Sequence, residues 1–247
     1  EQLAEAFNKK PEDLKELGKE DGRDLGTITK RFIERYELDP KLIASHGHTI
    51  FHRPDEGFTL QIGDGQEIAK ATGITTVNDF RSEDVMKGGQ GAPLVPIGDR
   101  HLFADYPICL NIGGIANVSY EYEGKRIAYD ICIANQMLNY LANKLGYDYD
   151  NNGSFARQGK VNLDLLKAFN DNSYYDKEAP KSLGREFFEK YQHQIIEESS
   201  LDVRDILATA TEHIASQIVK STDMLEKSKM LITGGTPKKN YHTKRIS

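Results

Sequence analysis

Two patterns of apolar residues alternate along the chain and predict its secondary structure. Helical spacing predicts a first helix that begins after Pro11 and ends near Tyr36. The further segments with this spacing are Gln66–Ala71, Met137–Leu145, Leu163–Phe169, Phe187–Ile196 and Ile206–Val219. Alternation or short apolar runs predict strands at Leu42–Ala44, Phe58–Ile62, Ile74–Val77, Ile108–Asn111, Ile115–Tyr122, Arg126–Tyr129 and Met230–Thr233. The mixture of strands and helices favours the α/β fold class.

The stretch richest in turn residues, Gly88–Pro93, marks a change of domain. The 247 residues allow one large domain or two modest ones. We place the boundary just before this stretch, near Asp84, because a hinge needs permissive backbone. We therefore expect a first domain over 1–84 and a second over 85–247.

Composition narrows the class of partner. The chain has 32 Lys and Arg against 38 Asp and Glu, a net charge of −6, which argues against nucleic acid or an anionic membrane. No run approaches the roughly 20 apolar residues of a membrane helix. Cys109 and Cys132 are flanked by Ile and Leu. We interpret them as buried small side chains of a cytoplasmic protein, with a disulfide or a thiol nucleophile as alternatives.

Two glycine pairs follow predicted strands and are candidate nucleotide contacts. Gly113 and Gly114 come after Asn111 and join two predicted strands. A glycine hairpin lets backbone N–H groups approach phosphate oxygens without interference from a Cβ atom. Gly234 and Gly235 end the last predicted strand, where a base or ribose could lie against the sheet. Ordinary tight turns are the alternative. Neither pair fits the phosphate-loop or dinucleotide fingerprint.

Asp130 is the candidate acid–base residue. It ends the predicted strand over 127–129, and ligands of α/β sheets bind at such strand ends. There a carboxylate can act as a general base or help to hold Mg²⁺. The alternative is an N-cap for the next helix. Asn135 lies five residues further on and could offer its amide to the same ligand.

A polar turn follows the predicted strand at Leu42–Ala44. Ser45, His46 and Thr49 present hydroxyl and imidazole groups suited to a polar small molecule, and a purely structural turn is the alternative. His46, His48 and His52 also suggest zinc, but no Cys or nearby carboxylate completes the ligand shell, so we expect no metal bound by them.

Arg81, Asp84 and Gln90 lie at another predicted strand end, close to the turn-rich stretch. Arg81 can hold a substrate carboxylate with two hydrogen bonds. The alternative is an exposed ion pair with a neighbouring acid, which contributes little. We expect these groups to line a cleft at the domain boundary, where ligand sites concentrate.

Five segments, by their order and spacing, carry a resemblance to a known family. They are Ser45–Thr49, Gln61–Gly65, Asp79–Asp84, Gly88–Pro96 and Leu110–Val118. Together they resemble the anhydro-N-acetylmuramic acid kinases, over the chain from about Leu14 to Gly235. Lys181–Phe187 is similar to that family's Lys-Ser-Thr-Gly-Arg-Glu segment.

The resemblance implies an actin-like, Hsp70-like (ribonuclease H-like) ATPase fold with nucleotide between two α/β domains. It implies an enzyme that uses ATP and Mg²⁺ to open 1,6-anhydro-N-acetylmuramic acid with water and to phosphorylate its 6-oxygen. Asp130 takes the place of the family's catalytic Asp, and Asn135 that of the Asn in the same motif. Gly113 and Gly114 become a phosphate hairpin, and Gly234 and Gly235 part of the adenosine site. A homodimer is also implied.

Three departures from the family pattern leave alternatives open. Ile131–Ala134 replaces a Gly-Pro-Gly stretch, and His48 stands where Gln is commoner. The family's first phosphate loop and the segments after its adenosine site have no counterpart here, so the fold is expected to be incomplete at both ends. The alternatives are a non-catalytic sugar-binding relative, a fragment, and a related kinase for another sugar.

Overall fold

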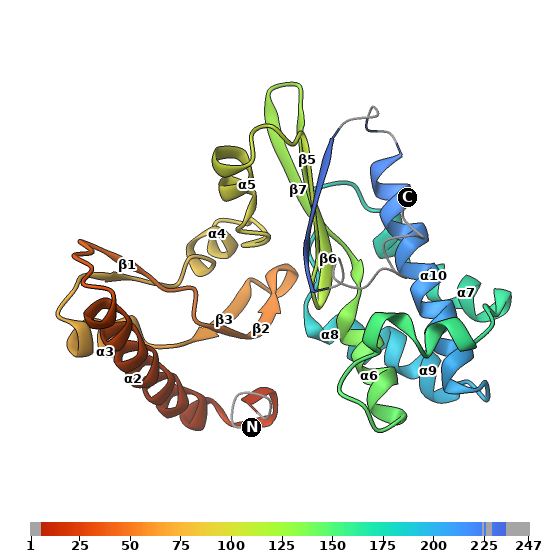
Figure 1. Cartoon of the computed structure of the whole chain (residues 1–247), viewed down its shortest axis with the longest axis horizontal. Coiled ribbons are helices and arrows are strands. Elements are labelled where there is room, and N and C mark those ends of the chain that lie inside the picture. The colour runs from red at the N-terminus through yellow and green to blue at the C-terminus, as the bar shows by residue number, and fades with distance from the viewer. Residues whose placement is uncertain (1–5, 224, 226–228, 236–247) are drawn as a thin grey trace. The chain divides into compact units, whose positions relative to one another are not determined.

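The computed structural model describes residues 6–223, 225 and 229–235. The chain forms two compact units, Glu1–Gly91 and Ala92–Ser247 (Figure 1). Each unit combines helices with strands, which confirms the predicted α/β class. The units divide at Gly91–Ala92 rather than at Asp84. The Asp84 carboxylate accepts a hydrogen bond from the Gly91 N–H at 2.6 Å, which ties the turn-rich stretch to the first unit.

The first unit contains two small sheets and three α-helices among its described residues. Its elements are η1 (Ala6–Asn8), α2 (Pro11–Arg35), β1 (Ile43–Ala44), β2 (His48–Arg53), η2 (Pro54–Glu56), β3 (Phe58–Ile62), α3 (Gly65–Thr72), β4 (Thr76–Val77) and α4 (Ser82–Met86). Strand β1 pairs in parallel with β4, and β2 pairs antiparallel with β3. The sequence pattern missed β2, whose polar His48, His52 and Arg53 interrupt its apolar positions. It also missed α4 and predicted β4 two residues too long.

Helix α2 packs closely through a row of glycines. Pro11 occupies its first turn, and Gly18, Gly22 and Gly26 recur every four residues on the buried face. A Cβ atom at Gly22 would lie 2.5 Å from the backbone oxygen of Asp64, which caps α3 through its side chain. The missing side chain at Gly22 therefore lets α2 approach the start of α3.

Two alanine substitutions on this row are expected to have opposite effects on stability. A Cβ atom at Gly18 would make an ordinary 3.7 Å contact with Ile62, so Gly18→Ala should stabilise the helix by about 0.5–1 kcal/mol. Gly22→Ala should destabilise the protein by about 1–3 kcal/mol, because the backbone of Asp64 would have to move away from the new Cβ atom. Equilibrium unfolding in urea measures both. Effects of the same sign would contradict this account of the packing.

The second unit is built on a four-stranded sheet with the order β7-β6-β5-β8. Its elements are α5 (Pro96–Leu102), β5 (Ile108–Ile112), β6 (Ile115–Tyr122), β7 (Lys125–Ile133), α6 (Asn135–Lys144), η3 (Asn151–Gly153), η4 (Ala156–Gln158), α7 (Leu163–Asn170), η5 (Ser173–Asp176), α8 (Arg185–Phe187), the π-helical turn η6 (Phe188–Gln192), α9 (His193–Glu198), α10 (Val203–Thr222) and β8 (Met230–Gly234). Strand β8 is parallel to β5, and the other pairs are antiparallel. The predicted glycine hairpin between β5 and β6 is confirmed. The sequence missed α5 and the π turn that interrupts the helix predicted over 187–196.

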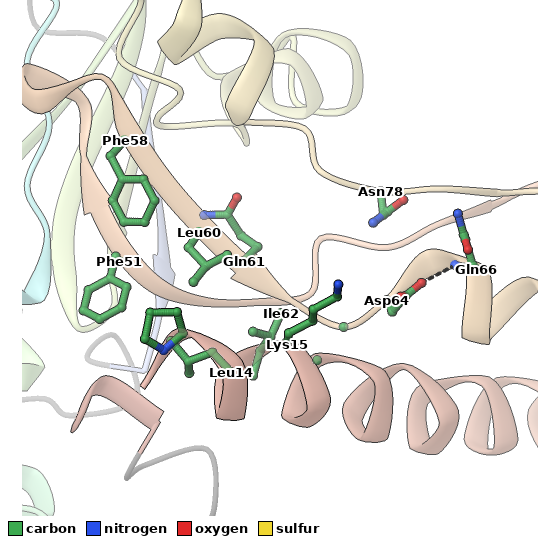
Figure 2. A pocket seen from close by; sticks show the side chains of 13 residues that line it. Leu14, Lys15, Phe51, Phe58, Leu60, Gln61, Ile62, Asp64, Gln66 and Asn78 are labelled. Atoms are coloured by element: carbon green, nitrogen blue, oxygen red, sulfur yellow. Dashed lines mark hydrogen bonds between the residues drawn. The ribbon is translucent and has the colours of Figure 1, made fainter. Parts of the chain in front are cut away.

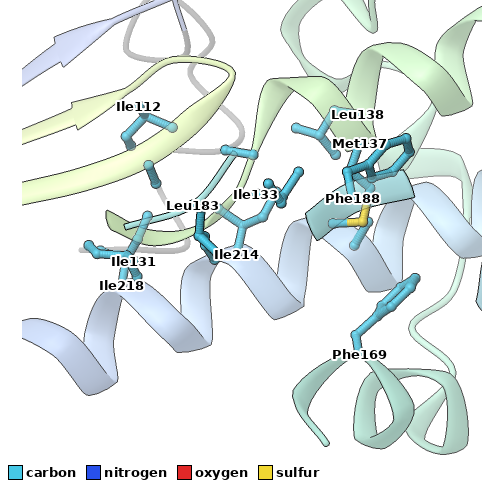
Figure 3. Close-up of a cluster of buried hydrophobic side chains, with 14 of the residues drawn as sticks. Ile112, Ile131, Ile133, Met137, Leu138, Phe169, Leu183, Phe188, Ile214 and Ile218 are labelled. Carbon is cyan, nitrogen blue, oxygen red and sulfur yellow. The ribbon is translucent and has the colours of Figure 1, made fainter. Parts of the chain in front are cut away.

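A large apolar core joins the sheet of the second unit to its helices (Figure 3). Ile112 and Ile133 from the sheet meet Met137 of α6 and Ile214 of α10. Cys109 and Cys132 are free and buried, as predicted, and burial raises the pKa of both thiols. Among the described helices, none is long and apolar enough to cross a membrane.

His213, inside the core of the second unit, should make stability depend on pH. Its Nδ1 lies 2.8 Å from the Asn170 Oδ1, and burial lowers the His213 pKa from 6.5 to about 3. The unfolded chain binds more protons between these values, so stability is lost as pH falls below 6.5. The expected loss is about 3 kcal/mol at pH 4. Unfolding free energies at pH 7 and pH 4 measure it, and His213→Gln should lose about 3 kcal/mol less between them than the parent protein. Equal losses would contradict this prediction.

Candidate functional site

A row of polar residues crosses the sheet of the second unit near one end. Thr233 of β8 pairs with Asn111 of β5, Asn111 pairs with Asn117 of β6, and Asn117 pairs with Asp130 of β7. Side chains of directly opposed residues project from the same face. The Thr233 hydroxyl lies 3.4 Å from the Asn111 Oδ1. The register thus brings the predicted Asn111 and Asp130 onto one face, two strands apart.

Asn117 was not predicted as a site residue. It lies three positions after Gly114, as Asn111 lies three positions before it. That symmetry about the hairpin is the signal that could have identified Asn117, because it places both amides at one level of the sheet.

The glycine hairpin is joined to the start of α6. Gly113 accepts a hydrogen bond from the Asn135 N–H at 3.0 Å, and Gly114 accepts one from Ala134 at 2.8 Å. The Asn135 side chain donates to the Ile112 carbonyl at 3.3 Å. Gly114 itself is exposed. The predicted residues Asn135, Gly113 and Gly114 therefore belong to one compact group with an accessible turn.

The second glycine pair meets the same group. Gly234 has a φ of +101°, and a Cβ atom there would overlap the Ile112 carbonyl group. A Cβ atom at Gly235 would meet the Asn135 amide at 3.7 Å. Both glycines are exposed. The predicted nucleotide contacts Asn111, Gly113, Gly114, Gly234 and Gly235 are thus brought together with Asn135.

Asp130 lies inside β7 rather than at its end, so the predicted strand boundary was wrong. The strand continues to Ile133, because Ile131, Cys132 and Ile133 favour a buried strand. The N-cap alternative is also wrong, since Ala134 occupies that position of α6. A β-bulge leaves Ile131 without an opposite residue and changes the register beside Asp130.

Asp130 is 5% exposed, and its Oδ2 accepts a hydrogen bond from the Leu183 N–H at 2.9 Å. This donor holds the carboxylate in one orientation. A carboxylate fixed in this way, on the same face of the sheet as Asn111, can accept a proton from a bound water or hydroxyl group.

The residues near this end of the sheet, which are Asp130 and the two glycine pairs, are compatible with a nucleotide and a divalent cation. Mg²⁺ is usually held by one or two carboxylates together with phosphate oxygens, and Asp130 supplies one carboxylate. The absence of a Cβ atom at Gly234 lets β8 lie close to Ile112, whose carbonyl group a Cβ atom would overlap. The described residues contain no group of three or more His, Cys, Asp or Glu side chains placed to hold a metal by themselves.

In the first unit, His46 and Arg81 form a hydrogen-bonded pair. The Arg81 Nε and one terminal nitrogen lie 3.1 and 2.9 Å from the His46 Nε2, and the His46 Nδ1 lies 3.0 Å from the Gly47 carbonyl. These partners fit a neutral imidazole that donates through Nδ1 and accepts at Nε2. Arg81 also donates to the Gly91 carbonyl at 2.6 Å. The structure thus brings two predicted residues together, and the binding of a carboxylate by Arg81 stays a prediction.

The other predicted residues of the first unit surround this pair in the sequence. The Ser45 N–H donates to the Val77 carbonyl and so extends the pairing of β1 with β4. Thr49 lies in β2 opposite Gln61. Asp84 belongs to α4 and holds Gly91. Gln90 is partly buried in the turn-rich stretch.

His52 is buried in the first unit. It is 8% exposed, and its Nδ1 lies 3.2 Å from the Thr59 hydroxyl. Burial, helped by the charge of Arg81, lowers the His52 pKa from 6.5 to about 4. His52 is therefore neutral at physiological pH, and burial accounts for this.

The first unit also holds a cavity of about 680 Å³ between α2 and β3 (Figure 2). Its wall includes Leu14, Phe51, Phe58, Leu60 and Asn78. None of the predicted site residues of the first unit is part of this wall.

Comparison with known proteins places these features in a family. The family model for anhydro-N-acetylmuramic acid kinase matches residues 1–246. The kinase of that name from Zymomonas mobilis is 41% identical over 203 residues, which cover 79% of this chain and 54% of that protein. The one from Pasteurella multocida is 36% identical over 254 residues, covering 95% of this chain and 67% of that protein. The chain thus spans between about half and two thirds of these relatives.

Likeness to solved structures is weak. The ethanolamine utilization protein EutJ from Carboxydothermus hydrogenoformans aligns over 92% of this chain and 66% of that chain, at 13% identity and a TM-score of 0.41. This likeness carries no argument about function. The family-model match and the sequence identities above are sufficient by themselves to assign the family. The chain belongs to the anhydro-N-acetylmuramic acid kinase family.

Proposed function

We propose that the protein is an ATP-dependent kinase that opens 1,6-anhydro-N-acetylmuramic acid with water and phosphorylates O6, giving N-acetylmuramic acid 6-phosphate. One observation carries this proposal beyond family membership. The fixed carboxylate of Asp130 shares a face of the sheet with Asn111, and Asn111 belongs to the glycine-lined edge formed by Gly113, Gly114 and Gly234. A base for water and a surface for phosphates are thus part of one sheet.

In the proposed reaction, Asp130 takes a proton from water as the water oxygen bonds to the anomeric carbon. The bond between that carbon and O6 breaks, and O6 forms a bond to the γ-phosphorus of ATP while ADP leaves. Proton transfer of this kind contributes about 10²–10⁴-fold to a rate. The exposed Gly114 of the hairpin is suited to a close approach of phosphate oxygens. Mg²⁺, when bound, neutralises the charge of the phosphates.

The sugar contacts are assigned to Ser45, His46, Thr49, Arg81, Asp84, Gln90 and Asn135. His46 and Arg81 support this assignment most strongly, because each fixes the other. Both ring nitrogens of His46 are already bonded, to Arg81 and to the Gly47 carbonyl, so His46 serves to hold the Arg81 guanidinium in place for the sugar. Asp84 accepts a hydrogen bond from the Gly91 N–H and therefore helps to shape the turn-rich stretch Gly88–Pro93. A homodimer and a cytoplasmic location are part of the same proposal.

The proposal is tested by following ADP release with MgATP, with and without 1,6-anhydro-N-acetylmuramic acid. Release that depends on the sugar is the expected result. If the sugar raises the melting temperature without any ADP release, the protein is a sugar-binding relative rather than a kinase.

A second candidate is a kinase of the same family for another sugar. It is favoured by Ile131, Cys132 and Ile133, which are buried apolar residues where the family usually has a Gly-Pro-Gly stretch. Because this segment follows Asp130 directly, it can change the shape of the sugar site. Competition settles the choice: another amino sugar would have to be turned over with a higher kcat/KM than the anhydro sugar.

A further inference from the structure

The segment Lys181–Leu183 lies against Asp130. Strand β7 is at the edge of its sheet, and the Asp130 N–H donates to the Lys181 carbonyl at 3.1 Å. Two residues further on, the Leu183 N–H donates to the Asp130 carboxylate at 2.9 Å. The same short segment therefore holds both the backbone and the side chain of the proposed base.

Both ends of this segment are anchored. Leu183 is 5% exposed and belongs to the apolar core together with Ile131 and Ile218 (Figure 3). The Lys181 ammonium lies 5.3 Å from the centre of the Tyr129 ring and 4.9 Å from that of Tyr174. It also donates to the Tyr174 carbonyl at 3.3 Å. Cation–π contacts of this kind are strongest where water is excluded.

Tyr174 closes the arrangement. Its hydroxyl donates to the Asp130 carbonyl at 2.6 Å. The N–H, the carbonyl and one carboxylate oxygen of Asp130 are thus all bonded by Tyr174 or by the segment that Lys181 anchors. Burial lowers the pKa of Lys181, so this ammonium is held inside the protein at a cost in desolvation.

We propose that Lys181 is a positioning residue, which holds the Lys181–Leu183 segment against Asp130 through the rings of Tyr129 and Tyr174 and so fixes the orientation of the Asp130 carboxylate. The catalytic consequence of this inference rests on the proposed function. A displacement of about 1 Å in a reacting group can reduce a rate 10²-fold. The orientation of Asp130 should therefore affect kcat more than the binding of the sugar.

The first test compares Lys181→Met with Lys181→Arg. Methionine keeps the length of the side chain but loses the charge, whereas arginine keeps a cation that can face both rings. We expect Lys181→Met to lower kcat about 10²-fold, with the KM for the anhydro sugar changed less than about threefold. Lys181→Arg should recover most of this loss. An unchanged kcat in Lys181→Met, or no recovery with arginine, would overturn the proposal.

Hydrogen exchange supplies a readout that does not need activity. In Lys181→Met, the amides of Leu183 and Asp130 should exchange at least about tenfold faster than in the parent protein, while those of α10 stay unchanged. If the parent protein releases no ADP but these amides respond, the proposed function fails and the positioning role stands. If ADP is released and these amides do not respond, the positioning role fails.

Two adjacent tyrosines provide the matched control. Tyr174 and Tyr175 are 6% and 5% exposed. Tyr174→Phe removes the hydroxyl bonded to Asp130, and Tyr175→Phe removes one bonded to Gln192. We expect Tyr174→Phe to lower kcat about tenfold and Tyr175→Phe to leave it within twofold. Equal effects would show that loss of a buried hydroxyl, rather than the position of Asp130, governs the rate, and would overturn the proposal.

Discussion

Replacing Asp130 by asparagine is expected to reduce sugar-dependent ADP release by about 10²–10⁴-fold, the usual contribution of a general base. The substitution changes the chemistry more than the structure. An asparagine oxygen can still accept the hydrogen bond from the Leu183 N–H, and the backbone bonds of Asp130 to Lys181 and Tyr174 remain. The amide cannot take a proton from water. Initial rates of ADP release, at saturating ATP and sugar, measure the effect.

Asp150 offers a control for the loss of a buried carboxylate. It is 1% exposed in the second unit, and its oxygens accept hydrogen bonds from the N–H groups of Phe155 and Ala156. Asp150→Asn should lower the melting temperature but leave kcat within about twofold, since hydrogen bonds to buried groups contribute to stability. If Asp130→Asn kept more than a tenth of the parent activity, Asp130 would not be the base.

The second large effect is expected from Gly234→Ala. A Cβ atom at this position would lie 2.6 Å from the Ile112 carbonyl carbon, and the φ of +101° is unfavourable for alanine. Strand β8 must therefore separate from β5 where both strands reach the glycine hairpin. We expect a loss of about 2–4 kcal/mol in unfolding free energy and at least tenfold weaker binding of ADP.

Gly235→Ala is the matched control for this prediction. The nearest atom to its Cβ would be the Asn135 amide nitrogen at 3.7 Å, an ordinary contact. Urea unfolding and calorimetric titration with ADP compare the two variants. Gly235→Ala should lie within about 0.5 kcal/mol of the parent in stability. Equal loss of ADP binding in both variants would show that the close approach of Gly234 to Ile112 is not what shapes the nucleotide edge.

Local patterns predicted much of the second unit. The hairpin between β5 and β6 follows from the glycine pair at Gly113–Gly114, and α6 follows from its apolar spacing. Such features depend on neighbouring residues, so one sequence is enough to find them. The prediction of where β7 ends was wrong for the opposite reason. Ile131–Ile133 continues the strand because these residues pack in the apolar core, which forms only when distant segments come together.

The parts of the site that sequence could not give depend on register and on long-range contacts. The spacing about Gly114 could have indicated Asn117, but only the register of the folded hairpin places it between Asn111 and Asp130. The Arg81–His46 pair joins residues 35 positions apart, and no local pattern indicates which partner an arginine will choose. The same is true of the Leu183 N–H on Asp130, which lies 53 positions away in the chain.

The most direct test of the central claim is the composition of the product formed in ¹⁸O-enriched water. If water opens the anhydro ring while O6 takes the phosphoryl group, the product carries one phosphoryl group and the elements of one water molecule, with ¹⁸O at the anomeric carbon. The sample must be read before that oxygen exchanges with solvent. A product that gains a phosphoryl group but neither water nor ¹⁸O would contradict the account, because Asp130 would then have no water to activate.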